Sequence, residues 1–240
     1  MPCLRIAHRG AAGTRPELTR PAFERALEIG VDMIELDVQL TADAQLVVLH
    51  DRELGRTVQA RGLVREHTLA QLCELDAGAW FALEYAGARV LGLQEVLDLT
   101  AGRAALNVEI KSPAPDWDRT AHALIALLTA TQRLDSTIVS SFETGALRAV
   151  RERCPEARLG VLWHGEDLDP MWLVAEGLAA GSVHPLWSLV DATVVEEAHR
   201  RDLALIVWTV NQPEPIGALA AIGVDGIISD YPERLREVLG

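Results

Sequence analysis

The chain has 240 residues, of which 49% are hydrophobic and 24% are charged, so it can bury a sizeable core as one domain or as two small ones. It carries 22 basic and 35 acidic residues, and the net charge of −13 argues against a nucleic-acid partner, because basic surfaces bind phosphate backbones. The same excess of acid argues against docking on anionic lipid surfaces. The composition fits both a highly soluble protein and a carboxylate cluster that holds a cation.

The three cysteines, Cys3, Cys73 and Cys154, are odd in number and widely spaced. They match neither a disulfide framework nor a CxxC metal site, which favours free thiols in a reducing compartment. No secretory signal is visible before the first apolar run, and no stretch approaches the roughly 20 apolar residues that span a bilayer. We expect a cytoplasmic protein without stable membrane anchoring, and the sequence leaves its oligomeric state open.

Short apolar runs and segments of helical periodicity alternate in the first part of the chain. Leu4–Ala7 is predicted to be a strand, and Pro21–Ile29 a helix that closes with Gly30. Met33–Val38 is the next predicted strand, and Leu46–Leu49 extends it after a turn. These elements predict a strand–helix–strand unit at the start of the fold.

The segment from Asp51 to Gly92 interrupts this alternation. It contains several glycines and scattered charges, and its strongest helical piece is Leu69–Leu75. We therefore interpret residues 51–92 as an insertion with short helices.

Regular alternation returns after the insertion. The predicted strands are Ala105–Ile110, Thr137–Ser140, Arg158–Leu162, Gly181–Val183, Ala204–Trp208 and Gly226–Ser229. The predicted helices are Asp118–Thr131, Glu143–Arg153, Pro170–Ala180, Thr193–Arg200, Pro213–Ala221 and Pro232–Leu239. Fully apolar strands separated by helices indicate a parallel sheet covered by helices. The number of units favours an α/β fold of the (β/α)8 barrel type, forming one domain over residues 1–240, rather than a doubly wound sheet.

Polar residues gather where such a barrel places its active site, at the carboxyl ends of the strands. In chain order these are His8 and Arg9, Glu35 and Asp37, Glu109 and Lys111, Ser140 and Ser141, Trp163 and His164, His184, Trp208 to Asn211, and Ser229 and Asp230. Ionisable residues in apolar strands are costly unless they are paired or bind a metal. The pattern therefore predicts a polar site at one end of the barrel, with His164 or His184 as a candidate to line it.

Three carboxylates are expected to converge at this site. Glu35 and Asp37 are two residues apart and point to the same side of their strand, and Glu109 lies one strand over. Their mutual repulsion would be relieved by protonation or by a divalent cation, and oxygen ligands favour Mg²⁺ or Ca²⁺ over zinc. The alternative is that the acids form salt bridges with Arg9 and Lys111 across the barrel.

Several short motifs occur in a specific order along the chain. They are His8-Arg9-Gly10, Pro16-Glu17, Glu35-Leu36-Asp37-Val38, Val47-Val48-Leu49-His50-Asp51, Asn107-Val108-Glu109-Ile110-Lys111, Ser140-Ser141-Phe142, Trp208-Thr209-Val210-Asn211 and Asp225-Gly226-Ile227-Ile228-Ser229-Asp230-Tyr231-Pro232. Each motif is weak alone, but the ordered set from His8 to Pro232 resembles the glycerophosphodiester phosphodiesterase family. The resemblance implies a TIM barrel, a divalent metal, and an insertion after the second strand, where residues 51–92 lie.

The resemblance also implies roles for individual residues. Carried over by position, they are His8 and His50 as the acid–base pair, Glu35, Asp37 and Glu109 as ligands of Mg²⁺ or Ca²⁺, and Arg9 and Lys111 as phosphate-binding residues. One position departs from the family, which usually reads Pro-Glu-Asn-Thr where this chain has Leu18 in place of Asn. The loss of that amide removes a hydrogen-bonding group expected near the site.

Three further residues are expected at the edge of the site. Glu17 is interpreted as a support rather than a ligand, and Asn211 as a hydrogen-bonding partner within the site. Trp208 is expected either to wall the substrate cleft or to cap the core.

The chemistry of a phosphodiester explains this set of residue types. The anion must be neutralised before attack, which a cation, an arginine and a lysine can do. Histidine suits the proton transfers because its reference pKa of roughly 6.5 lies near neutrality. The nucleophile can be the substrate's own glycerol hydroxyl, which gives a cyclic phosphate, or water, and the sequence leaves both routes open.

Three functions follow as hypotheses. The first is metal-dependent hydrolysis of a small-molecule glycerophosphodiester to sn-glycerol 3-phosphate and an alcohol. The second is a lysophospholipase D-like reaction on acyl lysophospholipids, which predicts an apolar groove around Trp80, Phe81 and Leu83. The third is a barrel that binds phosphate esters without hydrolysing them, which the complete set of histidines and acids disfavours.

Overall fold

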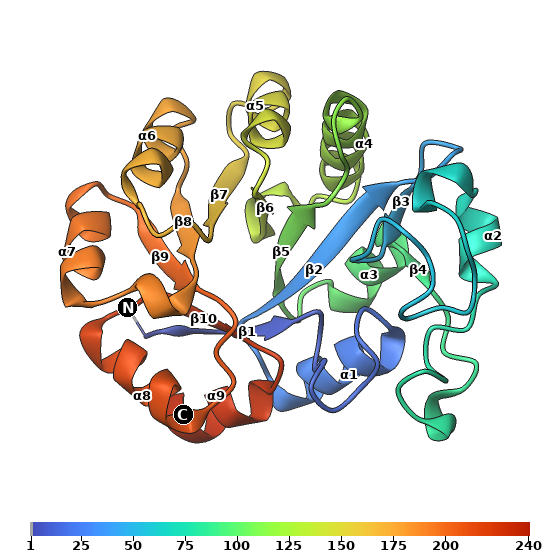
Figure 1. The fold of residues 1–240 in the computed structure, drawn as a ribbon, viewed down its shortest axis with the longest axis horizontal. Helices are drawn as coiled ribbons and strands as arrows, with labels where there is room; N and C mark the ends of the chain where they lie inside the picture. The colour runs from blue at the N-terminus through green and yellow to red at the C-terminus, as the bar shows by residue number, and fades with distance from the viewer. Residues whose placement is uncertain (1) are drawn as a thin grey trace.

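The computed structural model describes residues 2–240, and across them eight parallel strands close into a barrel (Figure 1). In chain order the barrel strands are β1 (Leu4–His8), β2 (Met33–Leu40), β5 (Ala105–Ile110), β6 (Thr137–Ser141), β7 (Arg158–Trp163), β8 (Ser182–Pro185), β9 (Ala204–Val207) and β10 (Gly226–Ser229). Strand β1 pairs with β10 on one side and with β2 on the other, which closes the ring. The predicted (β/α)8 barrel is confirmed.

Helices surround the strands on the outside of the barrel, as Figure 1 shows. They are α1 (Arg20–Ile29), α3 (Leu93–Thr100), α4 (Trp117–Ala130), α5 (Thr144–Arg153), α6 (Asp169–Gly177), α7 (Ala192–Arg200), α8 (Pro213–Ile222) and α9 (Pro232–Leu239), with 3₁₀ turns η3 (Leu134–Ser136) and η4 (Trp187–Leu189). Most bounds lie within one or two residues of the prediction. Helix α3 was not predicted, although its buried residues Leu93, Val96 and Leu97 have helical spacing.

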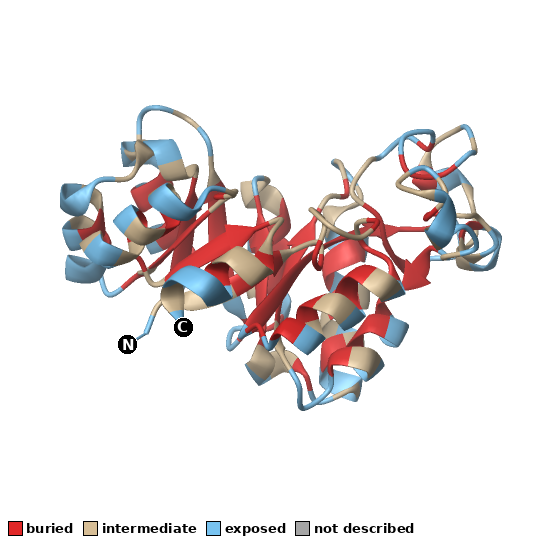
Figure 2. Cartoon of the chain, turned by 90° about the horizontal axis from the view of Figure 1, so that it is seen from below, coloured by how far each residue is buried: buried red, intermediate tan, exposed pale blue. Residues whose placement is uncertain are grey.

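Two apolar layers hold the barrel together. The larger core lies between the strands and the helices, so the buried strands in Figure 2 are flanked by helices with exposed outer faces. A smaller core fills the barrel interior with Ile6, Met33, Ile138, Ile206 and Ile228, all at most 4% exposed. Burying each such side chain contributes about 1.5–3 kcal/mol. Ile6 and Met33 precede the polar residues His8 and Glu35 on the same strands, so this interior core ends before those polar residues and leaves the space near them open.

The segment 51–92 attaches to the barrel through a small antiparallel extension. Strand β3 (Leu46–Val48) pairs with the end of β2, and β4 (Leu91–Gly92) pairs with β3. Between them lie η1 (Val64–Glu66), a single short α2 (Leu69–Cys73) and η2 (Leu83–Tyr85), and α2 ends two residues before the prediction. These elements pack on their own core of Val47, Leu49, Leu54, Val58, Val64, Leu72, Ala77 and Val90.

A tight turn follows β1, and its first residue, Arg9, lies at the carboxyl end of the barrel. Arg9 and Gly10 have φ angles of 52° and 79°, and a Cβ at Gly10 would lie 2.7 Å from the backbone carbon of Ala22 in α1. The backbone N–H of Ala11 donates to Ala22 at 3.0 Å, and that of Leu18 donates to Arg9 at 3.0 Å. Only glycine fits position 10 without strain, so this close packing against α1 fixes the backbone that carries Arg9.

No helix among residues 2–240 carries an apolar stretch of bilayer-spanning length.

Candidate active site

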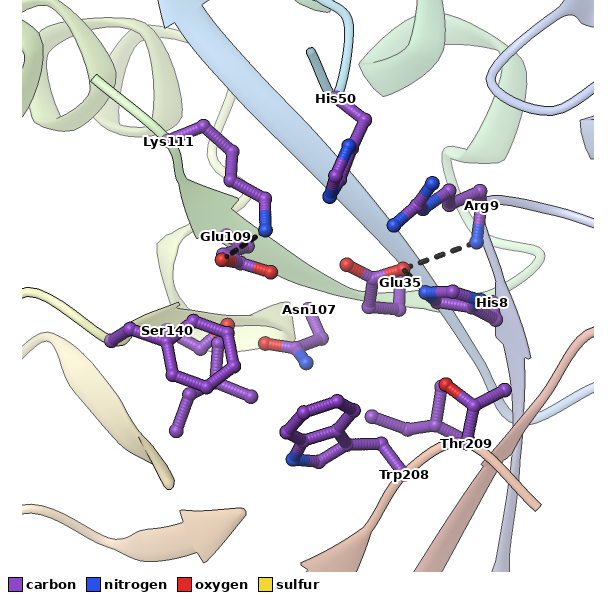
Figure 3. A pocket seen from close by; sticks show the side chains of 13 residues that line it. His8, Arg9, Glu35, His50, Asn107, Glu109, Lys111, Ser140, Trp208 and Thr209 are labelled. Carbon is purple, nitrogen blue, oxygen red and sulfur yellow. Dashed lines mark hydrogen bonds and ion pairs between the residues drawn. The ribbon is translucent and has the colours of Figure 1, made fainter. Parts of the chain in front are cut away.

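A pocket of about 300 Å³ opens at the carboxyl ends of the barrel strands (Figure 3). Its lining includes the predicted site residues His8, His50, Arg9, Lys111, Trp208, Glu35 and Glu109. They come from β1, β2, β5 and the segments that follow β1, β3, β5 and β9. Residues separated by up to 200 positions are therefore brought together as the sequence predicted.

The three predicted carboxylates form one cluster. Glu35, Asp37 and Glu109 each offer an oxygen within 4.8 Å of the others, and Asp37 pairs directly with Glu109 in the sheet register. Burial, followed by repulsion from neighbouring acids, raises the pKa of Glu35 well above its usual range and that of Glu109 to about 8. Both oxygens of Asp37 lack a hydrogen-bond partner among the described residues. A buried cluster of three carboxylates with free acceptor oxygens on Asp37 fits a hard divalent cation.

Two cations face this cluster from the pocket lining. Arg9 lies 3.3 Å from Asp37, and Lys111 lies 3.5 Å from Asp37 and 2.7 Å from Glu109. Burial lowers the pKa of Lys111, but the neighbouring acids outweigh it and raise the pKa overall. The predicted salt bridges between the acids and Arg9 and Lys111 are therefore also present. Arg9 also pairs with Glu17 at 2.9 Å, so the three acids of the cluster exceed the two neighbouring cations in number.

His8 contacts Asp230, an acid that the sequence predicted at the end of the last strand but without a role. Its Nδ1 lies 2.6 Å from Oδ1 of Asp230, and its Nε2 lies 3.8 Å from Glu35. Asn211 donates to Asp230 at 2.7 Å, which agrees with its predicted supporting position. Burial raises the pKa of Asp230, but hydrogen bonds from His8 and Asn211 lower it overall, so the carboxylate stays ionised. The arrangement turns Nε2 of His8 toward the carboxylate cluster.

His50 has an equivalent partner next to it in the chain. Its Nδ1 lies 2.7 Å from Asp51, which pairs at 2.5 Å with Arg56. Arg56 also binds Glu17 at 2.7 Å, so Glu17 joins the two loops that carry Arg9 and His50. Burial is the main cause that lowers the pKa of His50 below its usual value. The imidazole is therefore neutral near pH 7 and able to accept a proton.

A buried amide on β2 secures the backbone around His50. The side-chain N–H₂ of Gln39 donates to the carbonyl oxygens of Leu49, His50 and Asp51 at 2.9, 3.3 and 2.8 Å. Gln39 is 3% exposed and lies two residues beyond Asp37 on the same strand. Gln39 alternates with Glu35 and Asp37 along β2, so its side chain could have been predicted on the same side of the strand as the two acids.

Aromatic side chains form one wall of the pocket. Strand β9 ends at Val207, one residue earlier than predicted, and Trp208 follows it. The indole N–H of Trp208 donates to the carbonyl of His184 at 2.7 Å, and its ring meets Phe142 edge-on with centroids 5.4 Å apart. Trp208 both lines the pocket and packs on the interior core, so both readings of its position hold.

Some predicted neighbours lie elsewhere. Neither His164 nor His184 lines the pocket; His184 is fully buried, and burial lowers its pKa to about 3. Leu18 is 3% exposed and belongs to the main core, so the position where the family has Asn contributes no polar atom to the pocket lining.

The apolar groove expected around Trp80, Phe81 and Leu83 is not part of this pocket. None of the three side chains is in its lining, and Leu83 is 87% exposed. The structure therefore gives no support to an acyl-binding extension from that segment.

Comparison with known proteins agrees with this geometry. The model of the glycerophosphoryl diester phosphodiesterase family matches residues 8–234. A glycerophosphodiester phosphodiesterase from Caldanaerobacter subterraneus is 39% identical over 236 residues, covering 98% of this chain and 97% of that protein. One from Bacillus altitudinis is 35% identical over 97% of this chain and 96% of that protein.

Solved structures share the fold over nearly the whole chain. An Oleispira antarctica phosphodiesterase in complex with the product sn-glycerol-3-phosphate superposes with a TM-score of 0.91 at 29% identity, covering 97% of this chain and 95% of the other. A glycerophosphodiester phosphodiesterase from Agrobacterium tumefaciens gives a TM-score of 0.87 at 28% identity, covering 99% and 100%. From the family match and the identity to its relatives, the chain belongs to the glycerophosphoryl diester phosphodiesterase family.

Proposed function

We propose that the protein hydrolyses glycerophosphodiesters to sn-glycerol 3-phosphate and an alcohol, with one divalent cation, Mg²⁺ or Ca²⁺, and with His8 and His50 as its acid–base pair. The observation that carries the proposal is that two imidazoles, each bound at Nδ1 by a carboxylate, share one pocket with two members of a cluster of three buried acids. Family membership supports the reaction, and the donor chemistry of the cluster supports the metal.

Charge neutralisation is the first requirement of the reaction. Glu35, Asp37 and Glu109 would hold the cation, which when bound supplies positive charge for the phosphoryl oxygens. Arg9 and Lys111 line the same pocket and can bind the phosphate as a planar fork and as a point charge. Because both cations already contact Asp37, they are held in place before the substrate arrives.

Proton transfer is the second requirement. His50 is buried enough to be neutral near pH 7, so it suits the base that takes the proton of the attacking hydroxyl. His8 can donate a proton from Nε2 to the leaving alcohol, because the ionised Asp230 at Nδ1 stabilises the imidazolium. The same pair serves attack by the glycerol hydroxyl and attack by water. Phosphorus NMR during turnover distinguishes the routes, since only the first passes through a cyclic phosphate.

The direct test is release of glycerol phosphate from a panel of glycerophosphodiesters, including glycerophosphocholine and glycerophosphoethanolamine, with Mg²⁺ or Ca²⁺. We expect turnover that stops on chelation and resumes on metal addition. His8→Ala and His50→Ala are expected to lose at least about 10²-fold in kcat, the usual range for general acid–base catalysis, with circular dichroism unchanged. Near-normal turnover by either variant contradicts the acid–base assignment.

We further propose that the whole chain acts as one catalytic domain in the cytoplasm. Strands β3 and β4 continue the barrel sheet, so the segment 51–92 is joined to the barrel by backbone pairing. All three cysteines are free, which suits a reducing compartment. A single thermal transition and cell fractionation test the two statements, and two separate transitions or an extracytoplasmic fraction would contradict them.

A further inference from the structure

Two buried polar side chains in the pocket have no hydrogen-bond partner within residues 2–240. Asn107 on β5 and Ser140 on β6 are 1% and 0% exposed, and both line the pocket. Among the described residues, neither the oxygen nor the nitrogen of the Asn107 amide, nor the hydroxyl of Ser140, makes a hydrogen bond. Proteins pair nearly all such buried groups, because an unpaired one costs its full desolvation penalty. Their partner must therefore come from what the pocket holds.

The sheet register places these two groups directly beside members of the carboxylate cluster. Asn107 is opposite Glu35, and Ser140 is opposite Glu109. Asn107 precedes Glu109 by two residues, so it lies about 7 Å from Glu109 along β5, level with Glu35. Figure 3 shows both side chains on the side of the carboxylates away from His50.

The inner end of the pocket, beside Asn107, borders the apolar interior core, because Ile138 lies opposite Asn107 in the register and belongs to that core. Leu162 and Ile228 line the same pocket, and both are buried. The pocket volume of about 300 Å³ is at the lower limit for ligand pockets, so it can enclose only a small part of a substrate. The inner end suits a short polyol with a group that can both donate and accept hydrogen bonds.

We propose that Asn107 and Ser140 form the subsite for the terminal hydroxyl of the substrate's glycerol moiety. This assignment rests on the proposed function, which places the phosphoryl group beside the carboxylate cluster. The hydroxyl next to the esterified carbon must stay near the phosphorus, whereas the terminal hydroxyl is one carbon further away and can reach Asn107 and Ser140 on the side of the carboxylates away from His50. A hydroxyl donates one hydrogen bond and accepts others, which matches an amide and a serine together.

The subsite has a consequence for substrate class. An acyl ester at the terminal position has no O–H to donate, and its chain would have to enter the closed apolar end of the barrel. A site built to bind a hydroxyl rejects analogues that lack it, because its own buried groups are then left unpaired. Deacylated glycerophosphodiesters are therefore the substrates, acyl lysophospholipids are excluded, and the variable alcohol extends toward the open mouth of the pocket.

The test compares two substrates that differ only at this hydroxyl. They are sn-glycero-3-phosphocholine and its 1-deoxy analogue, which keeps the neighbouring hydroxyl and so permits either route of attack. The wild-type protein is expected to favour the parent substrate by at least about 100-fold in kcat/KM. In Asn107→Leu and in Ser140→Ala, the ratio of kcat/KM for the parent substrate to kcat/KM for the 1-deoxy analogue is expected to fall to about tenfold or less. The fall should come from a lower kcat/KM on the parent substrate alone.

Two controls separate substrate binding from structure. Ser182→Ala removes a hydroxyl that is 3% exposed on β8, bonds to His184 and lies outside the pocket lining, so its ratio should equal that of the wild type. Asn107→Leu should unfold thermally no lower than the wild type, because it replaces an amide that is unpaired in the free protein. If that variant does not fold, Ser140→Ala gives the same comparison with a smaller change.

The outcomes are distinct. Wild-type turnover without discrimination, or an unchanged ratio in the folded variants, overturns the subsite while leaving the proposed function intact. Absence of wild-type turnover on the parent and on all other glycerophosphodiesters overturns the proposed function and the subsite with it. Equal loss on both substrates in Asn107→Leu also overturns the subsite, because it would mean that the amide serves the metal or the fold rather than the hydroxyl.

Discussion

Gln39→Leu tests whether one buried amide positions the proposed base. In the wild-type protein this amide donates to three successive carbonyl oxygens, those of Leu49, His50 and Asp51. Leucine has nearly the same volume but no donor, so the variant releases this backbone without leaving a cavity. We expect lower stability together with a lower kcat.

The expected size of both effects follows from the contacts. The amide makes two short hydrogen bonds, at 2.8 and 2.9 Å, each with a typical net contribution of about 0.5–1.5 kcal/mol. The carbonyl of Leu49, a residue only 6% exposed, also loses its partner, which costs about 1–3 kcal/mol of desolvation. A total near 3 kcal/mol would lower the Tm by roughly 6–12 °C for a chain of this size. A displacement of His50 by about 1 Å would lower kcat by on the order of 10²-fold.

The assay is thermal unfolding together with kcat and KM against pH, measured well below the Tm. A positioning role predicts that kcat falls while KM for the substrate changes little, and that the acidic limb of the pH profile moves as the surroundings of His50 change. Gln45→Leu, on the same hairpin but exposed, is the matched control and should behave as the wild type. Loss of stability with an unchanged kcat and pH profile would refute the positioning role, and no change in either would refute the energetic reasoning as well.

The remaining predictions concern three other features. Asp230→Asn removes the charge that stabilises a protonated His8, so kcat should fall by roughly 10- to 100-fold in steady-state kinetics without a change in fold. For Glu109, the folded pKa of about 8 exceeds the ordinary 4.5, so as pH rises between them the unfolded chain loses a proton that the folded chain keeps, and metal-free stability falls. Added Ca²⁺ or Mg²⁺ should therefore raise the Tm more at pH 8 than at pH 5, and an equal rise at both would contradict the cluster as the binding site. Gly10→Ala forces a Cβ against the backbone of α1 and should cost more than about 2 kcal/mol by thermal unfolding, whereas Gly177→Ala, with open space around it, should cost nothing.

Much of the site could be predicted because its signals are local. Glu35 and Asp37 share one side of a strand by simple alternation, and Glu109 follows in the next barrel strand. Once alternating strands and helices indicate a barrel, all carboxyl ends meet at one face. The carboxylate cluster and the position of His8 beside it follow from these two rules.

The partners of the predicted residues could not be found in the same way. Asp230 lies 222 positions from His8, and it reaches the imidazole only because β10 closes the barrel against β1. Helix α3 was missed because it directly follows the irregular segment 51–92, where the strand–helix rhythm is lost.

The sequence by itself determined the class of fold, the acids and imidazoles of the site, and the order of its motifs, because these depend on periodicity within single elements. Only the tertiary structure decided which groups are paired and which are left without a partner. That distinction separates Gln39, whose side-chain N–H₂ donates to three carbonyls, from Asn107, whose amide has no partner in the described part of the chain. Both are buried amides on neighbouring strands. Gln39 meets the backbone that follows the β2–β3 hairpin, whereas Asn107 faces the pocket between barrel strands, and the pattern of either strand alone does not encode this difference in surroundings.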